Sequence, residues 1–220
     1  MNHNYDNASY RAATRCGAYE STLVSNVPGG QPVVSFLGLR FGGPLTPDNR
    51  WQAPPPAACS SPATVTKATE WPSPCVQIKG QEGIEDCLYL NVFVPEERAA
   101  MLPEIYEVPD GRVDEGELLP VIVYIHGGGL LEGSPQGLPL WDVAGADPEG
   151  TGGGPMMVVS IQYRLGLFGW LALEELSVVE EEEKGREGGV GGRYRSGNYG
   201  LLDQQLALQW YVRRRGERRG

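Results

Sequence analysis

The chain has 220 residues, and its apolar content of 40% with 9% aromatic residues is enough to form a buried core. Its formal net charge of −10 argues against nucleic-acid binding, which requires an extended basic surface. No apolar run approaches the roughly 18 residues that a membrane span needs, and the N-terminus lacks the basic and apolar regions of a signal peptide.

Four apolar runs predict strands along the chain. The last two are rich in Val, Ile and Tyr and carry few charges, which is typical of strands buried on both faces of a sheet. The stretch between Leu37 and Trp71 is rich in Pro, Gly and small polar residues, and it is predicted to be loop. The predicted strands comprise residues 33–37, 88–94, 120–125 and 156–163.

Residues 201–212 predict an amphipathic helix, because Leu202, Leu206 and Trp210 recur at steps of four. Asp203 suits the first turn of this helix, and the entry is expected at Asn198 or at the Tyr-Gly pair that follows it. Two other stretches predict no regular structure. Residues 144–155 are rich in Gly and acidic residues, and residues 180–197 join four consecutive glutamates to a Gly/Arg run.

The strongest motif is a predicted strand that runs directly into His126, Gly127, Gly128 and Gly129. Consecutive glycines let the backbone turn sharply and bring its N–H groups close to a ligand, since no Cβ blocks the approach. Acyl-transfer enzymes use such donors to stabilise the negative oxygen of a tetrahedral intermediate. A plain glycine turn is the alternative. The histidine and the Gly-Ser pair at 133–134 favour an oxyanion hole, whose amides are expected to line a cleft.

Four cysteines stand at positions 16, 59, 75 and 87. Cys75 and Cys87 flank a short polar segment, which suits a disulfide in an oxidising compartment. Spacing alone is equally compatible with four reduced thiols.

Residues 85–92, Glu-Asp-Cys-Leu-Tyr-Leu-Asn-Val, are similar to the signature of type-B carboxylesterases, a group that includes cholinesterases, fungal lipases and neuroligins. Other segments resemble further landmarks in the family's order, and together the matches extend from about residue 33 to 212. The Tyr-Arg-Leu-Gly-Leu-Phe-Gly sequence and the long insertion after it favour the fungal esterase/lipase branch. The further landmarks are residues 36–45, 50–51, 71–75, 126–129, 162–170 and 198–210.

The resemblance implies an incomplete α/β-hydrolase fold, with the N-terminal strands and first crossover elements of a central, mostly parallel sheet. It divides the chain into a partly irregular segment 1–32, a partial carboxylesterase domain 33–212 with an insertion at about 176–197, and a divergent tail 213–220. The five arginines of the tail are interpreted as a divergent end rather than a nucleic-acid site. A large apolar face is expected to stay uncovered, because such a sheet needs later elements to cover it.

The resemblance also implies roles for individual residues. Gly128 and Gly129 look like the amide donors of the oxyanion hole, and His126 is expected to brace their loop through a ring hydrogen bond rather than act as a base. Neither a cofactor nor a metal is expected. The residues expected to be architectural are the Cys75–Cys87 disulfide, an Arg50–Glu85 ion pair near the mouth of the site and a buried Arg164–Asp203 pair.

No serine in the chain has glycine at both the −2 and the +2 position, as a nucleophile elbow requires. The only histidines are His3, which has no neighbouring motif, and His126. We therefore expect a fragment of a serine carboxylic-ester hydrolase that is inactive alone. In the full-length protein the partner is a small-molecule or lipid ester, and no oligomeric state is predicted. A non-catalytic binding module and a non-functional truncated product are the alternatives. The family and the disulfide favour secretion, and a cytoplasmic location is the alternative.

Overall fold

The computed structural model describes most of the chain, with gaps. His3, Cys16, most of the predicted 176–197 insertion and the last six residues of the tail lie outside the described residues. The described ranges are residues 9–14, 17–60, 64–78, 83–105, 119–146, 156–176 and 196–214.

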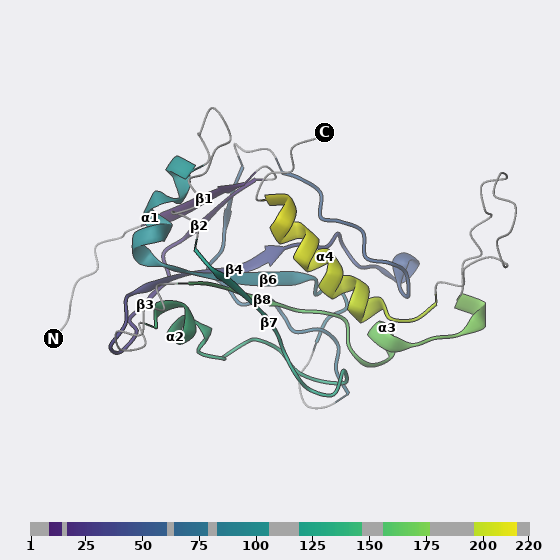
Figure 1. Ribbon diagram of the computed structural model, residues 1–220. Coiled ribbons are helices and arrows are strands. Elements are labelled where there is room, and N and C mark those ends of the chain that lie inside the picture. Colours follow the sequence, from purple (N-terminus) through teal and green to yellow (C-terminus); the bar gives the residue numbers. More distant parts are fainter. Residues whose placement is uncertain are drawn as a thin grey trace, which may run out of the picture.

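A five-stranded sheet with the order β3-β4-β6-β8-β7 forms the centre of the molecule (Figure 1). All four predicted strands are present, with ends shifted by no more than three residues. The neighbouring strands are antiparallel except β7 and β8, which are parallel and are joined through a crossover that contains α2 (Leu140–Gly145). The strands are β3 (Val24–Ser25), β4 (Val33–Arg40), β6 (Tyr89–Pro95), β7 (Val121–Ile125) and β8 (Met157–Ile161).

The expected mostly parallel pairing is thus confined, within the described residues, to β7 and β8. Parallel strands need a crossover connection of a dozen or more residues, and the chain before β7 returns instead through antiparallel pairings. The described strands therefore form the mixed, largely antiparallel side of the sheet.

A second, three-stranded sheet has the order β1-β2-β5. It comprises β1 (Tyr10–Thr14), β2 (Gly17–Ser21) and β5 (Val65–Lys67), in segments that the sequence predicted as irregular or loop. All three residues of β5 are exposed, so this strand has no apolar pattern to reveal it. Two backbone hydrogen bonds through Ala68 link the two sheets. The Leu37 amide of β4 donates to the Ala68 carbonyl, and the Ala68 amide donates to the Glu20 carbonyl of β2.

Strand β4 continues beyond its predicted end because a β-bulge between Phe36 and Leu39 keeps both side chains in one core. Gly38 lies at the bulge with φ of +71°, and its amide donates to Asn91 Oδ1 at 3.0 Å. Asn91 in turn donates to Ser160 Oγ at 3.1 Å. The asparagine of the signature segment therefore provides the acceptor that the bulge removes from the strand ladder.

The side chains of the large sheet form two apolar clusters, because successive residues of a strand point to opposite faces. On one face, Leu140 and Ala144 of α2 pack with Phe93 and Val158. On the other, Leu90 and Val159 pack in a cluster that also includes Ala99 and Ala207. Helices therefore lie against both faces of the sheet (Figure 1): α2 on one, and α1 (Glu96–Ile105) and α4 (Tyr199–Arg214) on the other.

Helix α4 contains the whole predicted helix and begins two residues earlier, at Tyr199. Asn198 stands immediately before it with φ of +57°, and its carbonyl accepts the amides of Leu201 and Leu202 at 3.0 Å. The short helix α3 (Gly166–Trp170) contacts α4. The remaining short helices are η1 (Pro47–Asn49) and η3 (Glu174–Leu176). None of the described helices combines the length and apolarity that crossing a bilayer requires.

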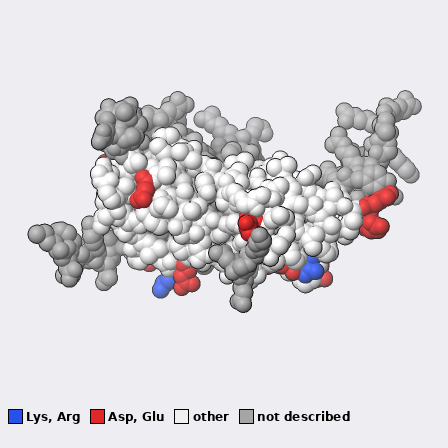
Figure 2. Space-filling view, turned by 90° about the horizontal axis from the view of Figure 1, so that it is seen from below, with Lys and Arg blue, Asp and Glu red and all other residues white. Residues whose placement is uncertain are grey.

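Strand β7 differs from the prediction that it is buried on both faces. It is the outermost strand of the sheet, and Ile122 and Ile125 remain 43% and 41% exposed, whereas β8 is buried from Val158 to Ile161. Charged groups are sparse on the face of the molecule seen from below (Figure 2). The sequence of β7 is apolar enough for a strand buried on both faces, but the described residues do not cover it completely.

Candidate oxyanion-binding loop

The segment 126–133, here called the glycine loop, leaves the end of β7 in a tight turn. Gly128, Gly129 and Leu130 all have positive φ, at 125°, 61° and 64°. The amides of Leu131 and Glu132 both donate to the Gly128 carbonyl at 3.1 Å, which closes the turn. A Cβ on Gly128 would lie 1.7 Å from the Glu132 carbonyl oxygen. The turn therefore requires glycine at this position.

Three successive peptide groups of the glycine loop have a hydrogen-bonded carbonyl. Tyr163 Oη donates to the His126 carbonyl at 2.8 Å, and His126 Nδ1 lies 2.9 Å from the Gly127 carbonyl oxygen. The Gly128 carbonyl accepts from the two amides that close the turn. Because a trans peptide is planar, its N–H points opposite to its carbonyl. Fixing these carbonyls therefore fixes the directions of the next N–H groups, including those of Gly128 and Gly129.

Within the described residues, the amides of Gly128 and Gly129 donate to no protein acceptor. Both glycines are exposed, as are Leu130 and Leu131 at 42% and 48%. The expectation that these amides line a cleft is not met by the described residues, because both glycines are exposed and the loop follows β7, the edge strand of the sheet. The loop offers two adjacent, oriented donors that are open to an approaching acceptor.

His126 is only 4% exposed and stacks on Tyr163, with ring centroids 4.4 Å apart. Burial lowers the pKa of His126, and its hydrogen bond with the Gly127 carbonyl opposes this shift. A neutral ring with its proton on Nδ1 is the donor that this carbonyl requires. This contact joins the imidazole ring to the backbone of the glycine loop.

The structure places Arg50 against Glu85 through two side-chain contacts, one of which joins Nε to Oε2 at 2.7 Å. The two side chains are 30% and 29% exposed. The guanidinium lies 5.4 Å from the ring centroids of both Trp51 and Phe168, which stack on each other. The pair therefore lies at a partly open surface, between an aromatic stack and the signature segment.

Arg164 and Asp203 form a second pair, and both are buried, with side chains 5% and 0% exposed. The carboxylate accepts from Arg164 Nε at 2.9 Å, from its Nη2 at 2.8 Å and from its backbone amide at 2.9 Å. Arg164 Nη2 also donates to the Gln52 carbonyl at 3.0 Å. These contacts tie the segment that follows β8 to α4. Because α4 begins two residues earlier than predicted, Asp203 lies just past its first turn rather than in it.

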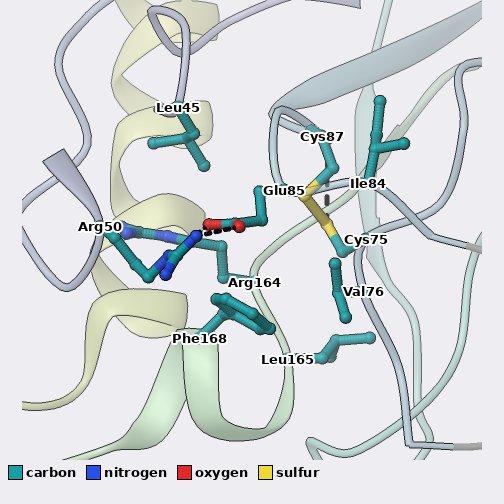
Figure 3. Close-up of a pocket in the computed structure, with 10 residues that line it drawn as sticks. All are labelled: Leu45, Arg50, Cys75, Val76, Ile84, Glu85, Cys87, Arg164, Leu165 and Phe168. Carbon is teal, nitrogen blue, oxygen red and sulfur yellow. Dashed lines mark hydrogen bonds and ion pairs between the residues drawn. A yellow bond between two sulfur atoms is a disulfide. The ribbon is translucent and has the colours of Figure 1, made fainter. Parts of the chain in front are cut away.

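Cys75 and Cys87 form a disulfide, with Cα atoms 5.1 Å apart. Cys59 is also disulfide-bonded, and no cysteine of the described part of the chain is free. A small pocket opens between this disulfide, the Arg50–Glu85 pair and Phe168 (Figure 3). Its lining comes from these elements rather than from the glycine loop, so the pocket and the two oriented donors are separate features.

Sequence reasoning did not find a third ion pair, between Arg40 and Asp86. Two hydrogen bonds of 2.7 Å join the side chains, and Asp86 Oδ1 also accepts the Leu45 amide at 3.1 Å. The Arg40 guanidinium holds the pKa of Asp86 below its usual range. Both residues belong to segments with family resemblance, but pairing across 46 positions leaves no local pattern. Gln77, which contacts Gly133, was missed for the same reason.

The described residues contain no group of three or more His, Cys, Asp or Glu side chains arranged to hold a metal ion. Near the glycine loop, the described residues offer hydrogen-bond donation by backbone amides.

A mixed sheet with helices on both faces and a glycine turn after a strand is the arrangement of an α/β-hydrolase, here an incomplete one. A family model described as "Carboxylesterase family" matches residues 12–214. The chain belongs to the carboxylesterase family.

The chain is similar to individual members of this family over most of its length. The chain is 33% identical over 198 residues to liver carboxylesterase of Sus scrofa, covering 82% of the chain and 28% of that protein. It is 31% identical over 206 residues to neuroligin-2 of Mus musculus, covering 81% of the chain and 22% of that protein. The solved structure of a PNB esterase matches with a TM-score of 0.63 at 30% identity, covering 93% of the chain and 34% of that structure. The chain thus spans between about a fifth and a third of the length of these relatives.

Proposed function

We propose that the chain is the part of a serine carboxylic-ester hydrolase that carries the oxyanion-binding loop. The observation that supports this is the pair of adjacent amides at Gly128 and Gly129, each oriented through a hydrogen-bonded carbonyl and each without a protein acceptor in the described residues. In this role the two N–H groups bind the substrate's carbonyl oxygen as it becomes an oxyanion. His126 orients the first donor and does not act as the base.

The nucleophile and base of this reaction lie outside residues 1–220 in this proposal. No serine of the chain has the flanking glycines of a nucleophile elbow. Two oriented donors polarise a carbonyl but form no acyl-enzyme by themselves. The proposal therefore includes that residues 1–220 alone hydrolyse no ester.

The proposed substrate is a small-molecule or lipid carboxylic ester, as suits a member of this family. The disulfide supports an oxidising compartment and hence secretion. The Tyr-Arg-Leu-Gly-Leu-Phe-Gly motif at 163–169 supports a place in the fungal esterase/lipase branch. Residues 1–32 and 213–220 are proposed to flank the partial hydrolase domain, and no membrane span or nucleic-acid partner is proposed.

A chimera tests the proposal directly. Residues 12–214 replace the matching part of the PNB esterase, so that the rest of that enzyme supplies the nucleophile and base. We expect hydrolysis of p-nitrophenyl esters, and we expect Gly128→Ala to lower kcat by about a hundredfold to a thousandfold, because an oxyanion donor is displaced. Gly127→Ala is the matched control, since a Cβ there meets nothing within 4 Å. The unjoined chain is expected to react with no fluorophosphonate probe, and labelling of a serine would contradict its inactivity.

A non-catalytic binding module is the second candidate. It is favoured by the similarity to neuroligin-2 and by the exposure of Leu130 and Leu131 beside the glycine loop. A folded chimera with no hydrolysis supports this candidate, whereas an active chimera that is indifferent to Gly128→Ala contradicts only the oxyanion-binding role of the two amides. Sequencing of the transcript beyond codon 214 separates the two independently, because a serine flanked by glycines after α4 supports the hydrolase. A transcript with no continuation supports a truncated product.

A further inference from the structure

We propose that Gln77 is a positioning residue for the glycine loop, an inference that rests on the oxyanion-binding role proposed for that loop. Its side-chain amide reaches Gly133 across 56 positions of sequence. Both hydrogen bonds of the Gln77 side chain go to Gly133 rather than to Gly128 or Gly129, so it acts on the two donors through the backbone of the loop.

The contact between Gln77 and Gly133 uses both polar ends of both groups. Gln77 Nε2 donates to the Gly133 carbonyl, and the Gly133 amide donates to Gln77 Oε1, each at 3.0 Å. A primary amide has the donor and acceptor needed to pair in this way with a backbone residue. The Ile78 amide adds a longer contact, at 3.4 Å, to the Leu131 carbonyl. The segment after Cys75 thus pairs with the returning arm of the glycine loop much as a strand would.

Gly133 packs directly against the base of the loop. With φ of +122°, a Cβ on this residue would lie 2.2 Å from the Gly127 carbonyl oxygen and 2.5 Å from His126 Nδ1. That carbonyl belongs to the peptide whose N–H is the Gly128 donor. Holding Gly133 in place therefore holds the His126 hydrogen bond that sets the direction of the donor, and releasing Gly133 lets this peptide rotate.

Gln77 is itself attached to a rigid base. It lies two residues after Cys75, which is buried and disulfide-bonded to the buried Cys87. The Ile84 amide also donates to the Pro74 carbonyl at 2.9 Å, which closes the other side of the disulfide loop. The uncharged side chain of Gln77 therefore extends from backbone that the disulfide holds in place. Charge neutrality matters, because a carboxylate in its place would face the Gly133 carbonyl oxygen with no hydrogen to donate.

Amide hydrogen exchange, followed by NMR on the disulfide-intact chain, tests the proposal. The reporters are the amides of Leu131 and Glu132, which close the turn on Gly128, and the amide of Val159 in β8 reports on the fold as a whole. In Gln77→Ala we expect the two loop amides to exchange about tenfold faster, as the loss of two hydrogen bonds predicts, with Val159 unchanged. Gln136→Ala is the matched control, because Gln136 lies in the segment that follows the loop and is exposed.

Gln77→Glu supplies an independent test with a pH profile. The ionised carboxylate keeps the acceptor for the Gly133 amide and loses the donor, whereas the protonated acid regains it. The measured quantity is the exchange rate of the loop amides in Gln77→Glu divided by their rate in the unmodified chain at the same pH. We expect this ratio to be well above one at pH 7 and to fall toward one as the new carboxyl group protonates. A side chain that only fills space shows no such recovery.

Three results overturn the proposal: unchanged loop exchange in Gln77→Ala, an equal change in Gln136→Ala, or a matching acceleration at Val159, which reports general destabilisation. A Gln77→Glu profile without recovery at low pH does so as well. None of these measurements involves ester hydrolysis. Failure of the oxyanion-binding role therefore appears in the chimera, and failure of the positioning role appears in the exchange data.

Discussion

The parallel strands β7 and β8 end at the same edge of the sheet, and the chain continues from each in a different environment. The segment after β8 enters a buried junction, where Arg164 pairs with Asp203 of α4. The segment after β7 forms the exposed glycine loop, whose turns are held by backbone, His126 and Gln77 hydrogen bonds. Two hydrogen bonds of 2.8 Å join the two segments: the Gly166 amide donates to the Leu130 carbonyl, and Tyr163 Oη donates to the His126 carbonyl.

The segments after β8 and after β7 depend on two different kinds of structural support. A charge buried without its partner has a large desolvation cost, so the junction is coupled to the stability of the whole fold. The hydrogen bonds of the glycine loop join neutral groups, and each contributes about 1 kcal/mol. Changes in the junction should therefore alter global unfolding, and changes in the loop should alter mainly the local direction of the donor amides.

The largest effect is expected from Asp203→Asn. The substitution leaves the buried Arg164 guanidinium without its counter-charge, and breaking such a pair costs about 3 to 5 kcal/mol. The measurement is the free energy of unfolding from urea denaturation. Glu85→Gln is the matched control, because its pair with Arg50 is partly exposed and solvent compensates the lost charge. Equal losses in the two variants would remove the distinction between a buried junction and an open pair.

An intermediate effect on the free energy of unfolding is expected from Asn198→Ala, at the residue immediately before α4. Asn198 has φ of +57°, a conformation that costs an alanine about 1 to 2 kcal/mol and that asparagine and glycine adopt more readily. We expect Asn198→Ala to lower the unfolding free energy by about that amount, and Asn198→Gly to lower it much less. If Asn198→Gly were as destabilising as Asn198→Ala, the side chain rather than the backbone conformation would support the start of α4.

The sequence predicted the features that depend on local patterns. Apolar runs located β4, β6, β7 and β8, and the step of four located α4. It did not predict α1, whose sequence has no regular apolar spacing and contains Pro103. It also missed the exposed strand β5, since three exposed residues carry no burial signal.

In the candidate site too, features with a local sequence pattern were predicted and contacts between distant residues were not. The glycine turn could be predicted because its consecutive glycines are visible in the sequence, and the structure shows that a Cβ on Gly128 has no room. The contact of Gln77 with Gly133 could not, because it joins positions 56 residues apart and a lone glutamine has no characteristic pattern. The exposure of Ile122 and Ile125 in β7 was equally inaccessible, because the composition of a strand does not say which elements cover it.

The smallest effect is expected from the pH dependence of His126, and it tests whether the glycine loop is coupled to the fold at all. Burial lowers the pKa of His126 from its ordinary value of 6.5. Below pH 6.5 the unfolded chain therefore binds a proton that the folded chain does not yet bind, so the free energy of unfolding falls as the pH drops. The loss stops once the pH passes below the lowered pKa. Because Nδ1 carries a hydrogen in both forms, the bond to the Gly127 carbonyl persists.

The measurement is the melting temperature between pH 8 and pH 5 for the unmodified chain, His126→Asn and His3→Asn. We expect acidification to lower the melting temperature more for the unmodified chain than for His126→Asn, because asparagine has no proton to bind. His3→Asn, which removes the only other histidine, should follow the unmodified chain. Parallel profiles for the unmodified chain and His126→Asn would mean that the loop opens before the fold melts. In that case the orientation of the Gly128 amide is a local property that no measurement of global stability detects.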